Sequence, residues 1–94
     1  MNTQNANNEV TKLELQVLTN IFRSEYQSVN SAEEAIGQPV WTSEATNDKK
    51  DLAGALGSCV KKGLAGVQEY SKSETNCWIT AQGAAVLNAN NVIL

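Results

Sequence analysis

The sequence predicts a small α+β domain in which helices precede a single β-hairpin. Its 94 residues suit one domain, and a hydrophobic fraction of 41% is ordinary for a folded globular protein. Thr11 and Glu14 have the T-x-x-E spacing of a capping box, which marks the start of a helix. Near the other end, Leu64–Tyr70 and Cys77–Thr80 have the character of strands, and the polar segment Ser71–Asn76 between them predicts a hairpin loop.

The N-terminal half predicts a tail and two helices. Residues 1–9 are polar and rich in asparagine, which predicts a disordered tail before a domain that spans residues 10–94. Apolar residues recur at helical spacing over residues 12–26, so we expect the first helix there. A second capping box at Ser31–Glu34 predicts a short helix that Gly37 ends.

The middle of the chain is expected to be extended and then irregular. Val40–Thr42 reads as a short extended segment. Ser43–Asn47 reads as a polar loop, with a turn of helix as the alternative. We expect Trp41 to pack in the core. Trp78 alternates with Ile79 along a strand, so Trp78 points outward if Ile79 points inward.

The second half predicts an amphipathic helix and a final helix. Asp48 is a suitable N-cap for a helix over residues 49–62, and Gly63 stands where such a helix ends in a left-handed residue. Thr80 can cap a last helix that runs through Leu87. On helix 49–62 the apolar face consists of Leu52, Ala55, Leu56, Cys59 and Val60, and the opposite face consists of Lys50, Gly54, Gly57, Ser58 and Lys61.

The charge is unevenly distributed along the chain. The net charge of −3 argues against general affinity for nucleic acid, and the first 48 residues are strongly acidic. Four of the seven basic residues nevertheless lie within residues 49–62. These lysines could contact phosphates. They could equally solubilise a helix surface, where Lys61 and Lys62 would also complement the negative C-terminal end of the helix dipole.

The residue types argue against catalysis and metal binding. The chain has no histidine, which removes the usual general base and imidazole ligand. Cys59 and Cys77 form no CxxC pair, and we expect two reduced, partly buried thiols rather than a disulfide. No secretory signal or membrane-spanning stretch is recognisable. We therefore expect a cytoplasmic protein without enzymatic activity, cofactor or membrane contact.

The segment from Cys59 to Leu87 resembles the second half of winged helix-turn-helix DNA-binding domains, especially the MarR-like ones. Their V-x-K-G-L and I-T-x-x-G patterns are matched by Val60, Lys62, Gly63, Leu64, Ile79, Thr80 and Gly83. With the upstream helices the resemblance covers residues 10–90. It implies a winged helix-turn-helix with three to four helices and a C-terminal β-hairpin wing. The small size also resembles phage or mobile-element proteins.

The resemblance implies binding to double-stranded DNA and a role as a small transcriptional regulator. Helix 49–62 would be the recognition helix, and residues 71–76 would form the tip of the wing. The DNA-contacting residues would then be Lys49, Lys50, Gly54, Gly57, Ser58, Lys61, Lys62 and Lys72. The helix has no Arg, Asn or Gln, the side chains that most often read base edges. The alternative is therefore a winged-helix module that binds a host or partner protein through an acidic surface and an exposed aromatic residue; a homodimer also remains open.

Overall fold

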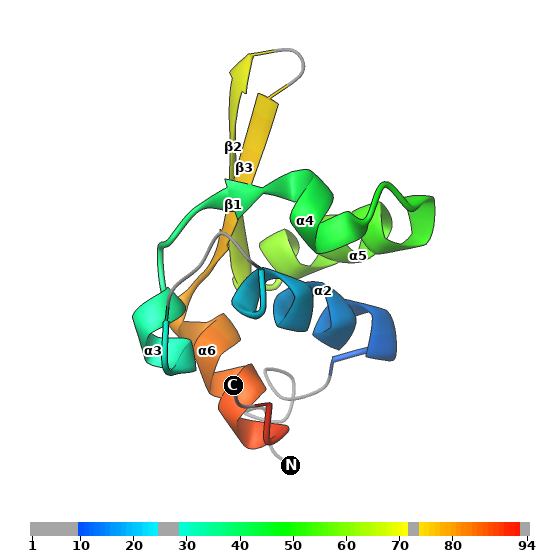
Figure 1. Ribbon diagram of the computed structural model, residues 1–94. Coiled ribbons are helices and arrows are strands. Elements are labelled where there is room, and N and C mark those ends of the chain that lie inside the picture. The colour runs from blue at the N-terminus through cyan, green and yellow to red at the C-terminus, as the bar shows by residue number, and fades with distance from the viewer. Residues whose placement is uncertain (1–9, 25–28, 72–73, 93–94) are drawn as a thin grey trace.

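The computed structural model describes residues 10–24, 29–71 and 74–92. This part of the chain has an α+β architecture with five helices, where the sequence predicted three or four, and a three-stranded antiparallel sheet (Figure 1). The expected tail, residues 1–9, lies outside the described residues. The elements in chain order are α2 (Lys12–Phe22), α3 (Ala32–Ala35), β1 (Val40–Trp41), α4 (Thr42–Thr46), α5 (Lys50–Lys61), β2 (Ala65–Ser71), β3 (Glu74–Ile79) and α6 (Ala81–Ala89).

Helix α2 begins at the predicted capping box. The Thr11 hydroxyl accepts a hydrogen bond from the Glu14 backbone N–H at 3.0 Å, and the Glu14 carboxylate accepts one from the Thr11 N–H at 3.0 Å. The helix ends at Phe22, short of the expected residue 26. Just beyond its end, the buried hydroxyl of Ser24 donates to Glu44 at 3.1 Å, and this bond holds the chain against α4.

Helix α4 occupies the segment for which the sequence predicted a polar loop, with a turn of helix as the alternative, and the structure selects the alternative. A helix of five residues has little stability of its own, so tertiary contacts must supply it. Ala45 is completely buried, and the side-chain amide of Asn20 on α2 donates to its carbonyl at 2.8 Å. Burial of one alanine and capping of one carbonyl by a distant residue thus favour helix here.

The prediction that Asp48 caps the next helix is wrong. Helix α5 is preceded by Lys49 at the N-cap position, with no side-chain cap hydrogen bond. Asn47 and Asp48 instead have φ angles of 51° and 58°, in the left-handed region that these two residue types tolerate best after glycine. They form the tight turn between α4 and α5. At the other end of α5, Gly63 has the predicted left-handed conformation, with φ of 79°.

The predicted hairpin is present as β2 and β3, and β1 adds a third strand in the order β1-β3-β2. Cys77 of β3 pairs with Val40 of β1 on one side and with Val67 of β2 on the other, so these three residues share one face of the sheet. The strands extend into the expected loop, because Ser71 still pairs with Glu74 after a register shift between Glu69 and Ser71. In Figure 1 the far half of the hairpin projects beyond the helices.

The core lies between α2 and the inner face of the sheet. Four residues of α2 are at most 1% exposed: Val17, Leu18, Ile21 and Phe22. Helix α2 packs against α4, α5 and α6, and Cys77 and Ile79 reach the core from the sheet. The hairpin is thereby anchored at its base. Helix α6 begins, as predicted, at Thr80, whose hydroxyl accepts from the Gly83 N–H at 3.1 Å.

The two tryptophans lie on the outer face of the sheet. Because side chains alternate along a strand and Val40 is buried, Trp41 points outward and is 42% exposed, so the prediction of a core position was wrong. Trp78 is half-buried next to the fully buried Ile79, as the alternation predicted. The outer face therefore presents aromatic surface to solvent.

Both cysteines are free and buried, as expected for reduced thiols. Burial is the main cause that raises the pKa of the Cys59 thiol to about 12, and burial likewise raises the pKa of Cys77 to about 12. Both side chains are therefore protonated at neutral pH and act as small core residues.

Candidate nucleic-acid interface

Helix α5 presents one continuous exposed face. Its apolar side is buried as predicted at Leu52, Ala55, Leu56 and Cys59, whereas Val60, the fifth predicted member, is half-buried. The opposite side, called here the α5 face, consists of Lys50, Gly54, Gly57, Ser58 and Lys61. These positions recur at the spacing of one helix stripe, and all are exposed except the half-buried Ser58. The structure thus brings five of the predicted site residues together.

Two glycines leave the backbone of this face bare. A Cβ atom built at Gly54 or at Gly57 would meet nothing within 4 Å. Glycine inside a helix costs about 1 kcal/mol relative to alanine. Among the described residues, no neighbour crowds either position, so packing within the domain does not account for that cost.

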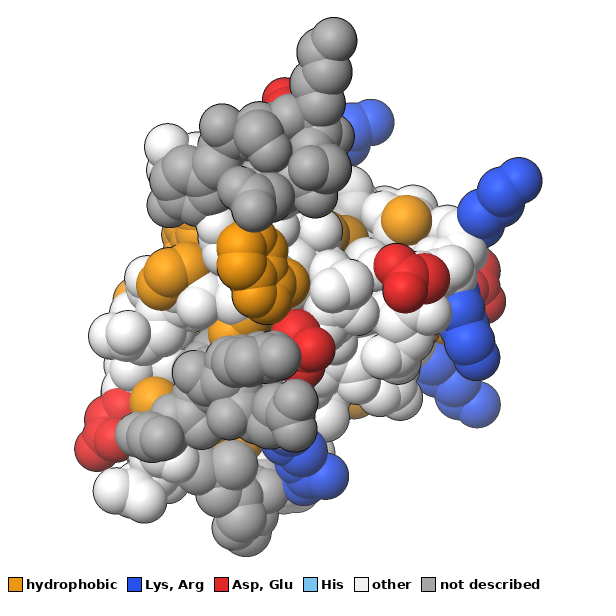
Figure 2. Space-filling model, turned by 45° about the horizontal axis from the view of Figure 1, so that its top comes forward, with side chains coloured by type: hydrophobic (Ala, Val, Ile, Leu, Met, Phe, Trp, Pro, Cys, Tyr) orange, Lys and Arg blue, Asp and Glu red, His pale blue; other side chains and the backbone are white. Residues whose placement is uncertain are grey.

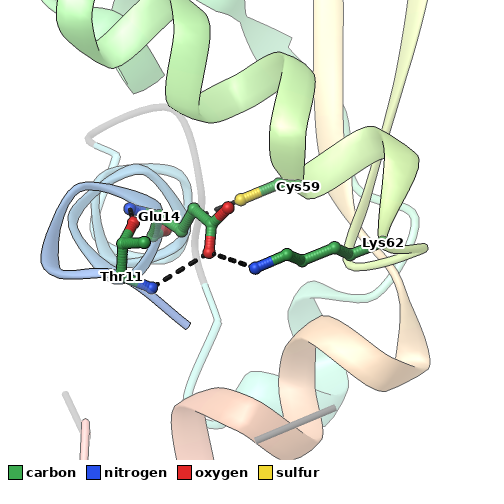
Figure 3. Close-up of polar contacts among 4 residues, drawn as sticks. All are labelled: Thr11, Glu14, Cys59 and Lys62. Carbon is green, nitrogen blue, oxygen red and sulfur yellow. Dashed lines mark hydrogen bonds and ion pairs between the residues drawn. The ribbon is translucent and has the colours of Figure 1, made fainter. Parts of the chain in front are cut away.

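Lys62 lies at the end of α5 and forms an ion pair with α2 (Figure 3). Its ammonium group is 2.8 Å from a carboxylate oxygen of Glu14, which is buried. The same oxygen accepts the N-cap hydrogen bond from Thr11, and the Cys59 thiol donates to the Glu14 carbonyl at 3.7 Å. Lys62, predicted to contact DNA, therefore connects α5 to the start of α2, and its pairing with Glu14 would compete with a phosphate contact.

The ion pair sets the protonation of Glu14. Burial raises the pKa of this carboxyl. Hydrogen bonds from Lys62, Thr11 and Ser58, together with the charge of Lys62, outweigh burial and hold the pKa below the ordinary value of 4.5. The unfolded chain therefore binds a proton at Glu14 more readily than the folded chain. The resulting stabilisation is fully present above the ordinary pKa and is lost as pH falls through the folded value.

We expect Glu14→Gln to flatten the acid dependence of stability. The variant should lose about 1–3 kcal/mol of unfolding free energy at neutral pH, because a charge-assisted hydrogen bond is weakened. Between about pH 5 and pH 3, the free energy of unfolding of the variant should then fall less than that of the wild type. Urea unfolding at a series of pH values measures both effects. Glu69→Gln, at an exposed carboxylate of β2, is the control, and equal pH slopes for Glu14→Gln and the wild type would contradict the assignment.

A shallow groove lies between α5, α4 and the hairpin. Its volume is about 520 Å³, and its walls are mostly apolar. Nine residues line this groove: Thr42, Thr46, Ala53, Leu56, Gly57, Val60, Lys61, Val67 and Thr75. Gly57 and Lys61 belong both to the groove and to the α5 face, so the two surfaces are continuous.

Charges of both signs surround these surfaces. Lys49, Lys50 and Lys61 are exposed, and so are Asp48 and Asp51. In Figure 2 basic side chains lie mainly toward the side where α5 begins, with acidic side chains among them, and hydrophobic side chains are exposed near the middle of this face. The surface is therefore a modest cationic patch beside an apolar one.

Within residues 10–24, 29–71 and 74–92, no three His, Cys, Asp or Glu side chains are grouped so that they could hold a metal ion. The same residues contain no helix with the length and apolar character needed to cross a membrane.

The α5 face, the hairpin and the groove between them define the candidate interface. No family model, curated protein or solved structure matches this chain. Besides the five residues of the α5 face, Lys49 lies exposed just before the helix. Of the other two predicted contacts, Lys62 pairs with Glu14, and Lys72 lies outside the described residues.

Sequence reasoning missed the groove. Its walls come from α4, α5, β2 and β3, and the sequence left open whether the α4 segment is a loop or a turn of helix. The alternation along β2 could have placed Val67 on the same face as Ala65, but nothing local shows that α5 stands opposite. The ion pair of Lys62 was missed for the same reason, because its partner is 48 residues away in the sequence.

Proposed function

We propose that this chain is a winged-helix protein that binds double-stranded DNA and acts as a small transcriptional regulator. Helix α5 would enter the major groove, and the β2–β3 hairpin would be the wing. The element order supports this proposal. Helices α4 and α5 are joined by residues 47–49, a turn of the length found in helix-turn-helix motifs, and the hairpin follows α5 directly.

The bare backbone of the α5 face is the observation that carries the proposal. Two glycines weaken the helix where the domain itself needs no space, so the space is available to something that approaches closely. Lys50 and Lys61 are at the two ends of the same face. Eleven residues at the helical rise separate them by about 16 Å, which suits contact with the phosphates on both sides of a major groove.

The number of exposed lysines limits the expected affinity. Lys50 and Lys61 are exposed on the α5 face and Lys49 is exposed just before it, whereas the nearby carboxylates oppose a polyanion. When the logarithm of the binding constant is plotted against the logarithm of the salt concentration, counterion release makes the slope more negative by about 0.9 for each phosphate contact. We therefore expect a slope near about −3, with a further contribution if Lys72 also reaches a phosphate.

We expect the double substitution Lys50→Ala and Lys61→Ala to flatten this slope by about two units, and to weaken binding equally for unrelated duplex sequences. Fluorescence anisotropy with labelled duplexes at several salt concentrations measures both effects. Lys12→Ala, which removes an exposed charge from α2, is the matched control and should change the slope little. An unchanged slope in the double variant would show that α5 is not the DNA-contacting helix.

A second function is favoured by one observation, the exposure of Trp41. A tryptophan that is 42% exposed on an acidic protein is a typical anchor for a protein partner. If the wild type binds no duplex even at low salt, DNA binding is wrong and this interaction function replaces it. Trp41→Ala is then the variant that should lose the partner.

A further inference from the structure

The groove exposes apolar surface that the domain could have covered. Val67 shares a sheet face with Val40 and Cys77, which are buried, yet Val67 is 43% exposed because it lies where the hairpin leaves the core. Opposite it, Ala53 is exposed on α5. The groove is thus a continuation of the core face that is open to solvent.

The polar groups of the groove are few, and one is already satisfied. The hydroxyl of Thr46 donates to the carbonyl of Thr42 at 3.1 Å, within α4. Among the described residues that line the groove, Lys61 is the one with a charge. A ligand that fits this groove therefore presents apolar groups to its walls and a negative charge at the Lys61 end.

Two lysines flank the groove at positions where they could hold phosphates. Lys61 lies at one end, and Lys50 lies about one helical turn before Ala53, beyond the other end. In a DNA major groove the thymine C5-methyl is the apolar group on the base edges, and alanine and threonine methyl groups contact it. The α5 sequence has no Arg, Asn or Gln for the bidentate contacts that read guanine and adenine.

We propose that the groove receives thymine methyl groups, so that the protein prefers T·A-rich duplexes through apolar contacts in the major groove. This inference rests on the proposed function, since it requires α5 to lie in that groove. Ala53 of α5 and Val67 of β2 supply apolar contacts on the two walls, while Lys50 and Lys61 hold the phosphates.

The test compares duplexes that differ only in the methyl group. Affinity is measured for alternating A-T DNA duplexes and for DNA duplexes in which deoxyuridine replaces thymidine, called here A-U duplexes. The two kinds of duplex have the same phosphate charge. Replacement of thymine by uracil should weaken binding about fourfold for each methyl group that is buried. Alternating G-C duplexes should gain affinity when cytosine is replaced by 5-methylcytosine, which places a methyl group at the same edge.

Two variants locate the contact in the groove. Ala53→Ser and Val67→Gln each introduce a polar group at an exposed position without loss of volume, and both should reduce the ratio of A-T to A-U affinity. Ala85→Ser, at an exposed alanine of α6, is the matched control and should preserve the ratio. Thermal unfolding checks that all three variants are folded.

The outcomes separate this inference from the proposed function. Equal affinity for A-T and A-U duplexes would overturn the thymine preference and leave DNA binding intact. An unchanged ratio in both groove variants would overturn the assignment to the groove. Absence of binding to every duplex at low salt would overturn the proposed function and this inference together.

Discussion

Gly57→Ala and Gly54→Ala are expected to stabilise the domain and to weaken its binding to DNA. The added methyl group meets no protein atom within 4 Å, so the helix gains about 1 kcal/mol at each position. That gain corresponds to a rise of about 4–8 °C in Tm for a domain of this size. The same methyl group occupies the space that the DNA would fill, which should cost roughly tenfold in affinity.

This prediction is specific because each substitution should raise the stability of the domain and lower its affinity for DNA. Thermal unfolding and duplex titration are measured on the same preparations. Ala85→Gly on α6 is the reverse control: it should lose about 1 kcal/mol of stability and leave the affinity of the folded protein unchanged. If Gly57→Ala and Gly54→Ala both bind duplex DNA as tightly as the wild type, no close approach occurs at the α5 face.

Gly83→Ala makes the same chemical change and is expected to have the opposite effect on stability. Gly83 is buried in α6, and a Cβ atom there would overlap the carbonyl oxygen of Leu64 and lie 3.4 Å from the Cβ of Ile79. The Leu64 carbonyl cannot turn away easily, because it accepts a hydrogen bond from the Thr80 N–H at 3.1 Å. We expect a loss of about 3 kcal/mol in the free energy of unfolding.

Urea unfolding of Gly83→Ala and Gly57→Ala side by side measures this contrast. A loss of about 3 kcal/mol is a large part of the stability of a small domain, so partial unfolding of Gly83→Ala at room temperature is a further expected sign. Retention of wild-type stability by Gly83→Ala would mean that α6 does not pack directly on the start of β2.

Several elements could be predicted from the sequence because their signals are local. Thr11 and Glu14 are three residues apart, and the side chain of each accepts a hydrogen bond from the backbone N–H of the other, independently of the rest of the chain. Thr80 caps α6 through a hydrogen bond of the same span. Gly63 adopts a left-handed conformation that other residues adopt only at a cost. The buried side of α5 follows from helical periodicity alone.

Other features depended on contacts between distant segments. Asp48 had the side chain of an N-cap, but the short link between α4 and α5 requires two left-handed residues, and Asp48 is one of them. Trp41 had the size of a core residue, but the pairing of Val40 with Cys77 decides which of the two neighbours points inward. In both cases the chain satisfies a tertiary constraint at the expense of a local preference.

The sequence by itself determined the starts of α2, α3 and α6, the hairpin and the cationic segment of this protein, because capping, alternation and charge are properties of near neighbours. Only the tertiary structure decided which lysine pairs with a buried carboxylate and where the groove lies. Lys61 and Lys62 are adjacent in sequence, yet one lines the groove and the other pairs with buried Glu14. The helix turns by about 100° between them, and the elements packed on each side give the two lysines different partners.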